Sequence, residues 1–176
     1  MYTDNVIDIH SIRANKIMNL IPYPSVRANK IININQYSNY VKTSKRGTHS
    51  QRVSKLCEAL GVAMEWSEAE INKLRISGLL HDIGKNTIDQ RIINKPGPLT
   101  VQEWNQIKMH PTIGYRILSS SQSMKEIAQY VLYHHERFDG SGYPIGLMQE
   151  EIPLISRIIS VADAYDAMTN QRTYKR

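Results

Sequence analysis

The residues best suited to chemistry in this chain are histidines and aspartates. Of its 6 histidines, all but His10 fall at or near the expected end of a helix, namely His49, His81, His110, His134 and His135. Asp82 directly follows a histidine, and Asp163 interrupts an apolar stretch. Imidazole nitrogens and carboxylate oxygens together suit ions such as Fe, Mn, Zn, Ni or Co. The pattern therefore predicts a metal cluster.

Each of these residues also has an ordinary structural explanation. A lone histidine at a helix end is more often hydrogen-bonded or exposed than a ligand, and Asp163 could form a buried ion pair with Arg157. The single Cys57 excludes an internal disulfide, argues against a thiolate zinc finger, and fits an apolar helical stripe in the core. Seven candidate ligands in one chain make the metal site the stronger hypothesis.

Helical signals must place these residues. Ser67 with Glu70, and Thr100 with Glu103, have the spacing of capping boxes at helix starts. The helix from Ser67 is expected to end near residue 84, with the pair at 81 and 82 in its last turn. Adjacent histidines at 134 and 135 project about 100° apart on a helix, so both can face one cavity only near a terminus or if two ions share the site.

Four further helices complete the pattern. The stretch "THSQRVSKLCEALGVAM" has apolar residues at helical spacing. Pro111 favours a helix start, "SMKEIAQYVLYHHE" is expected to be helical to its end, and a final helix is expected from near Pro153 to about Thr169. We therefore predict an all-α fold, a single helical bundle, in residues 48–176. Residues 1–47, rich in Asn, Ile and Tyr, are predicted to form an N-terminal helical extension.

Composition limits the function classes. The 176 residues have 41% hydrophobic content and a net charge of +6, with Lys and Arg scattered along the chain. That balance suits an acidic small ligand and predicts no binding of DNA or RNA. No apolar run is long enough to span a membrane, and no signal peptide is evident, so we expect a soluble, cytoplasmic protein.

Several short motifs occur along the chain in the order typical of one protein family. The segments "HDIGK", "HPTIGYRIL", "HHERFDGSGYP" and "ADAYDAMTNQRTYK" resemble the HD-GYP group of the HD phosphohydrolase superfamily, and the similarity covers about residues 46–175. The resemblance implies an HD-domain bundle that binds metal ions and hydrolyses the bacterial second messenger cyclic di-GMP. A diguanylate cyclase or a sensor protein is an expected partner.

The resemblance also implies roles for individual residues. It assigns His49, His81, Asp82 and Asp163 to one metal ion, and it has Asp82 bridge to a second ion held by His110, His134 and His135. Two divalent ions, Fe or Mn, would activate a bridging hydroxide that attacks phosphorus. The same motifs place Lys85 beside the scissile phosphate and Arg172 and Lys175 against the substrate.

The sequence departs from the family pattern at two places, and two other functions remain as alternatives to the phosphodiesterase activity. Lys45 stands where some members have a glutamate for a third ion, so two ions are expected. Relatives usually continue with further helices after the last motif, so we expect either a domain truncated at its C-terminal end or an unusually short protein. The alternatives are a non-catalytic module that binds cyclic di-GMP or docks on a partner, and a phosphohydrolase acting on another nucleotide.

Overall fold

The computed structural model describes residues 47–169. In chain order its helices are α3 (His49–Ala63), α4 (Glu68–Leu80), α5 (Gln90–Ile93), α6 (Val101–Lys108), α7 (His110–Ser119), α8 (Lys125–Leu132) and α9 (Leu154–Thr169). Short 3-10 turns are η1 (Ile83–Thr87), η2 (Gln122–Met124) and η3 (Gln149–Glu151). Within the described range the only strand-like pairing is one bridge between Asp139 and Met148. The prediction of an all-α fold is confirmed, while the predicted N-terminal extension lies outside the described residues.

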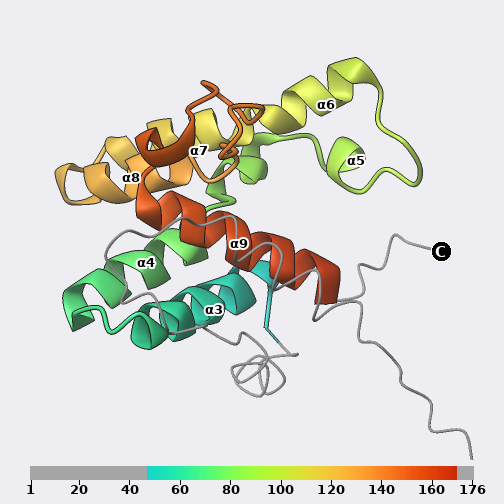
Figure 1. Ribbon diagram of the computed structural model, residues 1–176. Coiled ribbons are helices and arrows are strands. Elements are labelled where there is room, and N and C mark those ends of the chain that lie inside the picture. Colours follow the sequence, from blue (N-terminus) through green and yellow to red (C-terminus); the bar gives the residue numbers. More distant parts are fainter. Residues whose placement is uncertain (1–46, 170–176) are drawn as a thin grey trace, which may run out of the picture.

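Helix α9 is the central element of the bundle. It crosses between the pair α3 and α4 on one side and the pair α7 and α8 on the other (Figure 1). The larger apolar cluster joins α3, α4 and α9 and contains the fully buried Val53, Leu74 and Ile159. Cys57 also belongs to this cluster, which confirms its predicted role in packing. A smaller cluster joins α7 and α8 around Ala128 and Val131.

The predicted helix starts are correct. Ser67 accepts a hydrogen bond from the Glu70 amide, and the Glu70 carboxylate accepts one from the Ser67 amide at 2.9 Å. Thr100 and Glu103 form the same reciprocal pair. Such boxes satisfy amide groups that have no partner within the first helical turn. They fix where α4 and α6 begin.

Two predicted helix ends are wrong by a few residues. Helix α4 ends at Leu80 rather than near residue 84, and α8 ends at Leu132, before its two following histidines. In each case a histidine ring donates to the carbonyl three residues earlier, His81 to Gly78 and His134 to Val131. The ring nitrogen thereby satisfies a carbonyl that a helix end leaves without an amide partner, so the helix can stop there.

The turn η1 packs directly against the start of α7. A β-carbon added at Gly84 would collide with the backbone carbonyl of His110 and the backbone amide of Gly114. Only glycine permits this close approach of the two backbones. The contact brings the residues just before η1 next to the first residue of α7.

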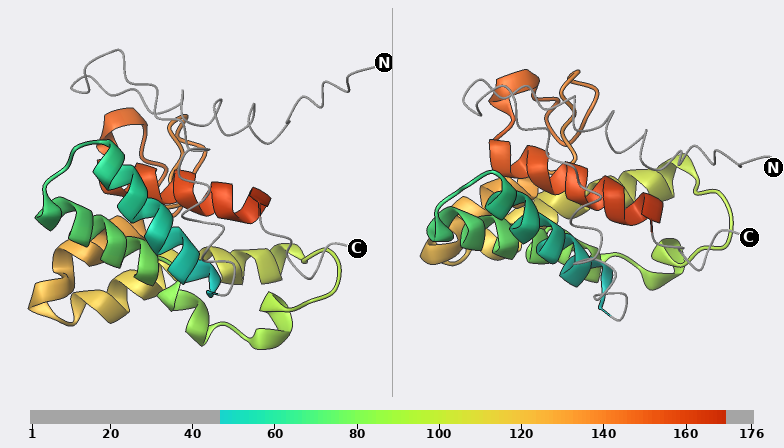
Figure 2. Two further views of the ribbon diagram at one scale, coloured as in Figure 1. Left: turned by 90° about the horizontal axis from the view of Figure 1, so that it is seen from below. Right: turned by 60° about the horizontal axis from the view of Figure 1, so that its bottom comes forward.

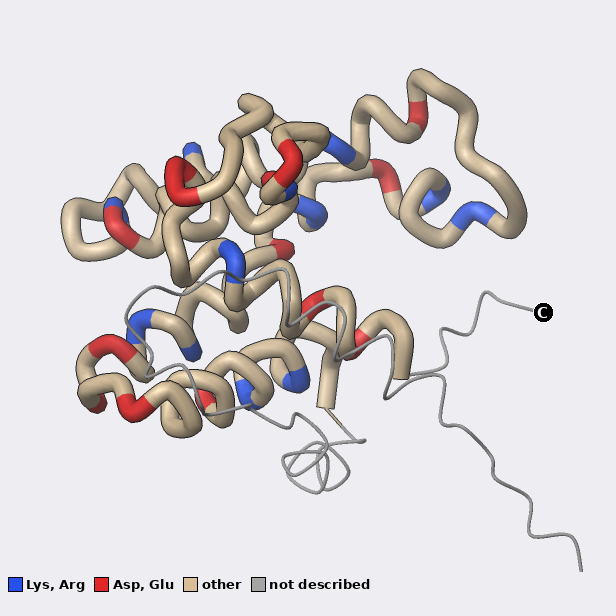
Figure 3. The backbone as a smooth tube through the Cα atoms, viewed as in Figure 1, with Lys and Arg blue, Asp and Glu red and all other residues tan. Residues whose placement is uncertain are grey.

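Along the backbone of residues 47–169, Lys and Arg positions are interspersed with Asp and Glu positions, with no extended basic run (Figure 3). The two further views in Figure 2 show α5 and α6 standing out from one end of the bundle, beyond α7. Among residues 47–169, none of the helices combines the length and apolar character needed to cross a bilayer.

Candidate metal centre

All seven predicted ligands meet in the interior of the bundle. They form two groups in which the ligand atoms lie within 4.8 Å of one another, the first being His49, His81 and Asp163 and the second Asp82, His110, His134 and His135. The side chains come from the starts of α3 and α7, from the residues that follow α4 and α8, and from the middle of α9. Five segments distant in sequence therefore supply one cluster.

Three histidines of the cluster are held in the same way. The Nδ1 atoms of His81, His110 and His134 lie 2.8, 2.7 and 2.6 Å from the carbonyl oxygens of residues 78, 107 and 131. A neutral ring that donates through Nδ1 has its lone pair on Nε2, and here each Nε2 faces the cluster. The C-terminal ends of α4, α6 and α8 also meet there, and their dipoles favour a cation.

The donor atoms fit divalent metal ions. His81 Nε2 and Asp82 Oδ1 are buried without a hydrogen-bond partner in the described residues. The Nε2 atoms of His110 and His134 are 3.3 Å apart. Metal–imidazole bonds of about 2.0–2.1 Å bring two nitrogens on one ion to about this separation. Without a cation or a proton between them, two lone pairs would face each other.

Asp82 lies between the two groups. Its Oδ1 is 3.3 Å from His110 Nε2, and its Oδ2 is 3.5 Å from His81 Nε2 and 3.8 Å from His49 Nε2. One carboxylate oxygen is thus turned toward each group. The Lys85 ammonium group lies 2.7 Å from the same Oδ2 and is 35% exposed, so it lines the opening of the cluster.

Burial keeps most of the imidazoles neutral. Desolvation lowers the pKa of both His110 and His135 to about 4. The charge of Lys85 lowers the pKa of His110 further, and His110 lowers that of His135. The pKa of the fully buried His134 is also lowered well below its usual value by desolvation. These rings are therefore available as ligands at neutral pH without losing a proton.

His49 differs from these three rings. Hydrogen bonds with Asp163 and then Asp166 raise its pKa to about 9, against the opposing effect of burial. Its Nε2 is 3.1 Å from Asp163 Oδ1, and its Nδ1 is 2.7 Å from Asp166 Oδ2. Asp163 therefore pairs with a histidine rather than with Arg157. Burial alone raises the pKa of Asp163, but His49 and the other rings hold it below the usual range.

Asp166 is a functional residue that the sequence reasoning missed. It is 1% exposed, accepts the His49 ring, and receives two hydrogen bonds from the Arg52 guanidinium at 2.8 and 2.9 Å. A buried carboxylate that orients a metal-binding histidine is a common supporting element of metal sites. The signal was present, because residues three apart on a helix share a face, as Asp163 and Asp166 do.

The loop after α8 closes one side of the cluster. The buried Glu136 carboxylate accepts hydrogen bonds from the backbone amides of residues 145, 146 and 147, at 2.8 to 3.1 Å. Gly142 lies against the backbone of Glu136, where a side chain would collide. The loop thereby presents the Tyr143 ring, which stacks on His135 with centroids 4.9 Å apart. Burial raises the pKa of the Tyr143 hydroxyl.

The remaining site predictions fall partly outside the described residues. Lys85 reaches the cluster, although from a 3-10 turn rather than from a continuing helix. Arg172, Lys175 and Lys45 lie outside residues 47–169, so their predicted roles remain predictions.

Comparison with known proteins adds the family context. A family model described as HD domain matches residues 38–176. A cyclic di-GMP phosphodiesterase of Thermotoga maritima is 46% identical over 129 residues, and one of Pseudomonas aeruginosa is 42% identical over 139 residues. A 3'3'-cGAMP-specific phosphodiesterase of Vibrio cholerae is 40% identical over 139 residues. The alignments cover 72%, 77% and 76% of this chain but only 35%, 34% and 26% of those relatives.

Proposed function

The chain belongs to the HD domain family, in its HD-GYP group, and from this premise we propose that it is a metal-dependent phosphodiesterase that hydrolyses cyclic di-GMP. The observation that carries the proposal is the convergence of five imidazoles and two carboxylates on one buried cluster. The chain spans about a third of the length of the first two relatives above. The substrate class is that of the activities for which those relatives are named.

We further propose that the cluster holds two ions, Fe or Mn. His49, His81 and Asp163 would hold one ion, and His110, His134 and His135 the other, with Asp82 as the bridge. When bound, such ions lower the pKa of a water shared between them and neutralise charge on a phosphodiester. The fixed Nδ1 hydrogen bonds support this assignment, because they pre-set the lone pairs and reduce the cost of ordering the ligands.

The residues around the proposed ions have separate roles in the reaction. Asp82 keeps one oxygen on each group and so sets their spacing. Lys85, whose ammonium group lies next to Asp82, would stabilise negative charge on the departing 3' oxygen and supply its proton. His110, His134 and His135 stay neutral and exclude bulk water. Arg172 and Lys175 would hold the parts of the substrate remote from the bond that breaks.

The decisive experiment compares substrates on metal-loaded protein. The protein is prepared without oxygen, loaded with Mn²⁺ or Fe²⁺, and incubated separately with cyclic di-GMP, the linear dinucleotide and 3'3'-cGAMP. Chromatography of the products separates the linear dinucleotide from GMP. The matched control is Asp82→Asn, which keeps the shape of the bridging side chain but removes its charge.

We expect cleavage of cyclic di-GMP by the parent protein and at least a hundredfold slower cleavage by Asp82→Asn. Cleavage of 3'3'-cGAMP alone would assign the chain to the activity named for the Vibrio relatives. Tight binding of cyclic di-GMP without cleavage, by protein that carries both ions, would replace the enzyme by a binding module. Cleavage only of other nucleotides would overturn the substrate class.

A further inference from the structure

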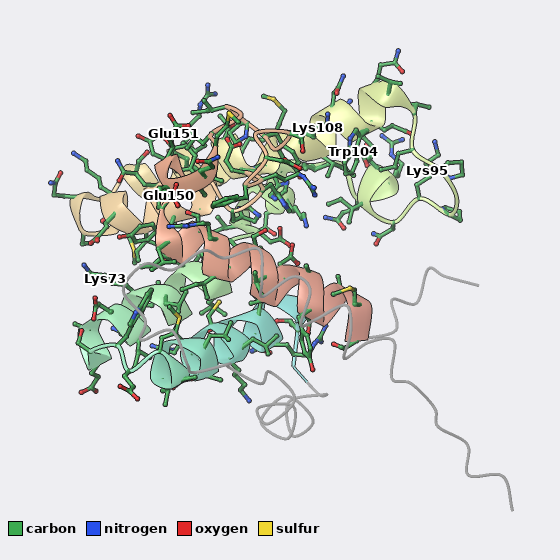
Figure 4. The ribbon with its side chains drawn as sticks, in the orientation of Figure 1. Lys73, Lys95, Trp104, Lys108, Glu150 and Glu151 are labelled. Carbon is green, nitrogen blue, oxygen red and sulfur yellow. The ribbon has the colours of Figure 1, made fainter. Side chains whose placement is uncertain are left out.

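The outer side of the cluster continues onto helix α6. Trp104 and Lys108 lie four residues apart on α6, so they occupy the same face of the helix. Lys108 ends this helix two residues before His110. The Trp104 side chain is 45% exposed, although large aromatic rings are usually well buried. Figure 4 shows both residues where α6 faces the loop that follows α8.

A continuous row of side chains links these residues to the metal ligands. The Tyr143 ring stacks on His135 with centroids 4.9 Å apart. The Lys108 ammonium group lies 6.0 Å from the centroid of the Tyr143 ring and 5.9 Å from that of Trp104. The exposed indole is therefore the outer end of a row that begins at the cluster.

Within the part of the chain that the structure describes, no carboxylate neutralises the charge of Lys108. Among residues 47–169, no carboxylate is paired with it, whereas Lys95 pairs with Glu103 at 2.7 Å and Lys73 with Glu126 at 2.8 Å. Figure 4 shows Lys73 on the opposite end of the bundle. Its contacts with two aromatic rings keep the Lys108 cation in place beside the cluster without cancelling its charge. This combination suits an anionic ligand.

We propose that Trp104 and Lys108 form a subsite for the second nucleotide of a cyclic dinucleotide. Trp104 stacks on the base of that nucleotide, and Lys108 contacts the phosphate that is not being cleaved. The inference rests on the proposed function, since a ligand with a phosphate at the metal cluster and a second nucleotide beyond it has to extend along one side of the cluster opening.

The chemistry of the two residues predicts the specificity of this subsite. Stacking on an aromatic ring accepts any base, because every base has a flat face, and it contributes about 1–3 kcal/mol per base. A lysine ammonium group acts on phosphate as a point charge and reads no sequence. The subsite should therefore strengthen binding of cyclic di-GMP and 3'3'-cGAMP to a similar degree.

The first test compares a large and a small phosphodiester. Trp104→Ala and Lys108→Gln are assayed with cyclic di-GMP and with bis(p-nitrophenyl) phosphate, which has no second nucleotide. Gln106→Ala, at an exposed position about 200° around α6 from Trp104, and Lys73→Gln, on the far side of the bundle, are the matched controls. Metal content is measured for every variant.

With both ions retained, each subsite variant should lower the ratio of kcat/KM for cyclic di-GMP to that for the small substrate by about tenfold, mainly through KM. The controls should leave this ratio within about twofold. Equal losses on both substrates in Trp104→Ala, or no loss on cyclic di-GMP, would overturn the proposal.

The second test is independent of turnover. A bis-phosphorothioate analogue of cyclic di-GMP, which resists hydrolysis, is titrated into the metal-loaded protein while tryptophan fluorescence is recorded. Stacking of a base on Trp104 should quench the emission of the parent protein, and Trp104→Phe should lack that quenching. If the parent fails to cleave cyclic di-GMP but is still quenched, the proposed activity is wrong and the subsite stands; binding without quenching overturns the subsite.

Discussion

At the scale of single residues, the cluster contains two kinds of histidine. His81, His110 and His134 donate hydrogen bonds through Nδ1 to backbone carbonyls, and burial lowers the pKa of His110 and His134. His49 instead gives its Nδ1 proton to the Asp166 carboxylate, and its pKa is raised to about 9. In the metal-free protein at pH 7, His49 therefore carries a second proton on Nε2. A metal ion has to displace that proton.

This difference predicts how Asp166→Asn changes metal binding. In the parent protein, the affinity for the ion at His49 should rise about tenfold per pH unit up to about pH 9, because protons compete below the pKa. The variant loses one of the interactions that raise this pKa, so its affinity should level off at a lower pH. It should also bind about 10–100-fold more weakly at pH 9, because its ring is a less basic and less fixed ligand.

Competition with a chelator between pH 6.5 and 9 measures both effects. The gap between parent and variant should narrow as the pH falls. Asp89→Asn, which removes an exposed carboxylate paired with Arg91, is the control and should follow the parent curve. A constant gap at all pH values would mean that Asp166 does not act through the protonation of His49.

Lys85 gives a second prediction at this scale. Its ammonium group lies beside Asp82 at the opening, so its charge should act on the transition state more than on the bound substrate. Lys85→Ala should lower kcat for cyclic di-GMP about a hundredfold or more with little change in KM, and Lys85→Arg should recover part of the rate. Steady-state kinetics on protein with measured metal content decides between this role and simple substrate binding, which would raise KM instead.

At the scale of elements, the loop from Arg137 to Ile152 depends on one buried side chain. Glu136 accepts amide hydrogen bonds from three consecutive residues, and these bonds hold the segment that carries Tyr143. A buried acceptor that is replaced by a donor leaves such amides without partners, at about 1–3 kcal/mol each.

Glu136→Gln should therefore loosen this loop while leaving the bundle folded. We expect trypsin to cleave after Arg137 about tenfold faster than in the parent, with far-ultraviolet circular dichroism unchanged. Glu150→Gln replaces an exposed carboxylate of η3 and is the matched control, with cleavage at the parent rate. Equal protection in Glu136→Gln and the parent would show that other contacts hold the loop.

The sequence allowed the helices and the ligands to be predicted better than the supporting contacts. Capping boxes are local, so the starts of α4 and α6 could be read directly. The ends of α4 and α8 could not, because they depend on where His81 and His134 direct their rings. Glu136 escaped notice for a similar reason, since its partners lie about ten residues away in a loop whose path only the folded chain defines.

At the scale of the whole molecule, the cluster joins segments on both sides of α9. Its ligands come from α3, the turn after α4, the start of α7, the loop after α8, and α9 itself. Ions bound in the proposed sites would therefore connect the two apolar clusters as well as serve chemistry. Anything that binds only the folded chain stabilises it by mass action, about 2.7 kcal/mol per site at a hundredfold excess over Kd.

Removing the ions should therefore lower the thermal stability. Dialysis against a chelator should reduce Tm by about 5–15 °C, given the usual sensitivity of Tm for domains of this size. Adding Mn²⁺ back should restore it, and Asp82→Asn should respond much less. Differential scanning calorimetry measures the shift. An unchanged Tm after verified metal loss would mean that bound ions do not stabilise the folded bundle.

The spread of the ligands along the chain also sets an order during synthesis. Because a ribosome makes the N-terminal residues first, Asp82, His110, His134 and His135 all exist before α9 has been made. The group with His49 and His81 has to wait for Asp163, in the last described helix. An unfinished chain thus has the complete ligand set of one group only, and the proposed site at His49 cannot have all its ligands until Asp163 has been made.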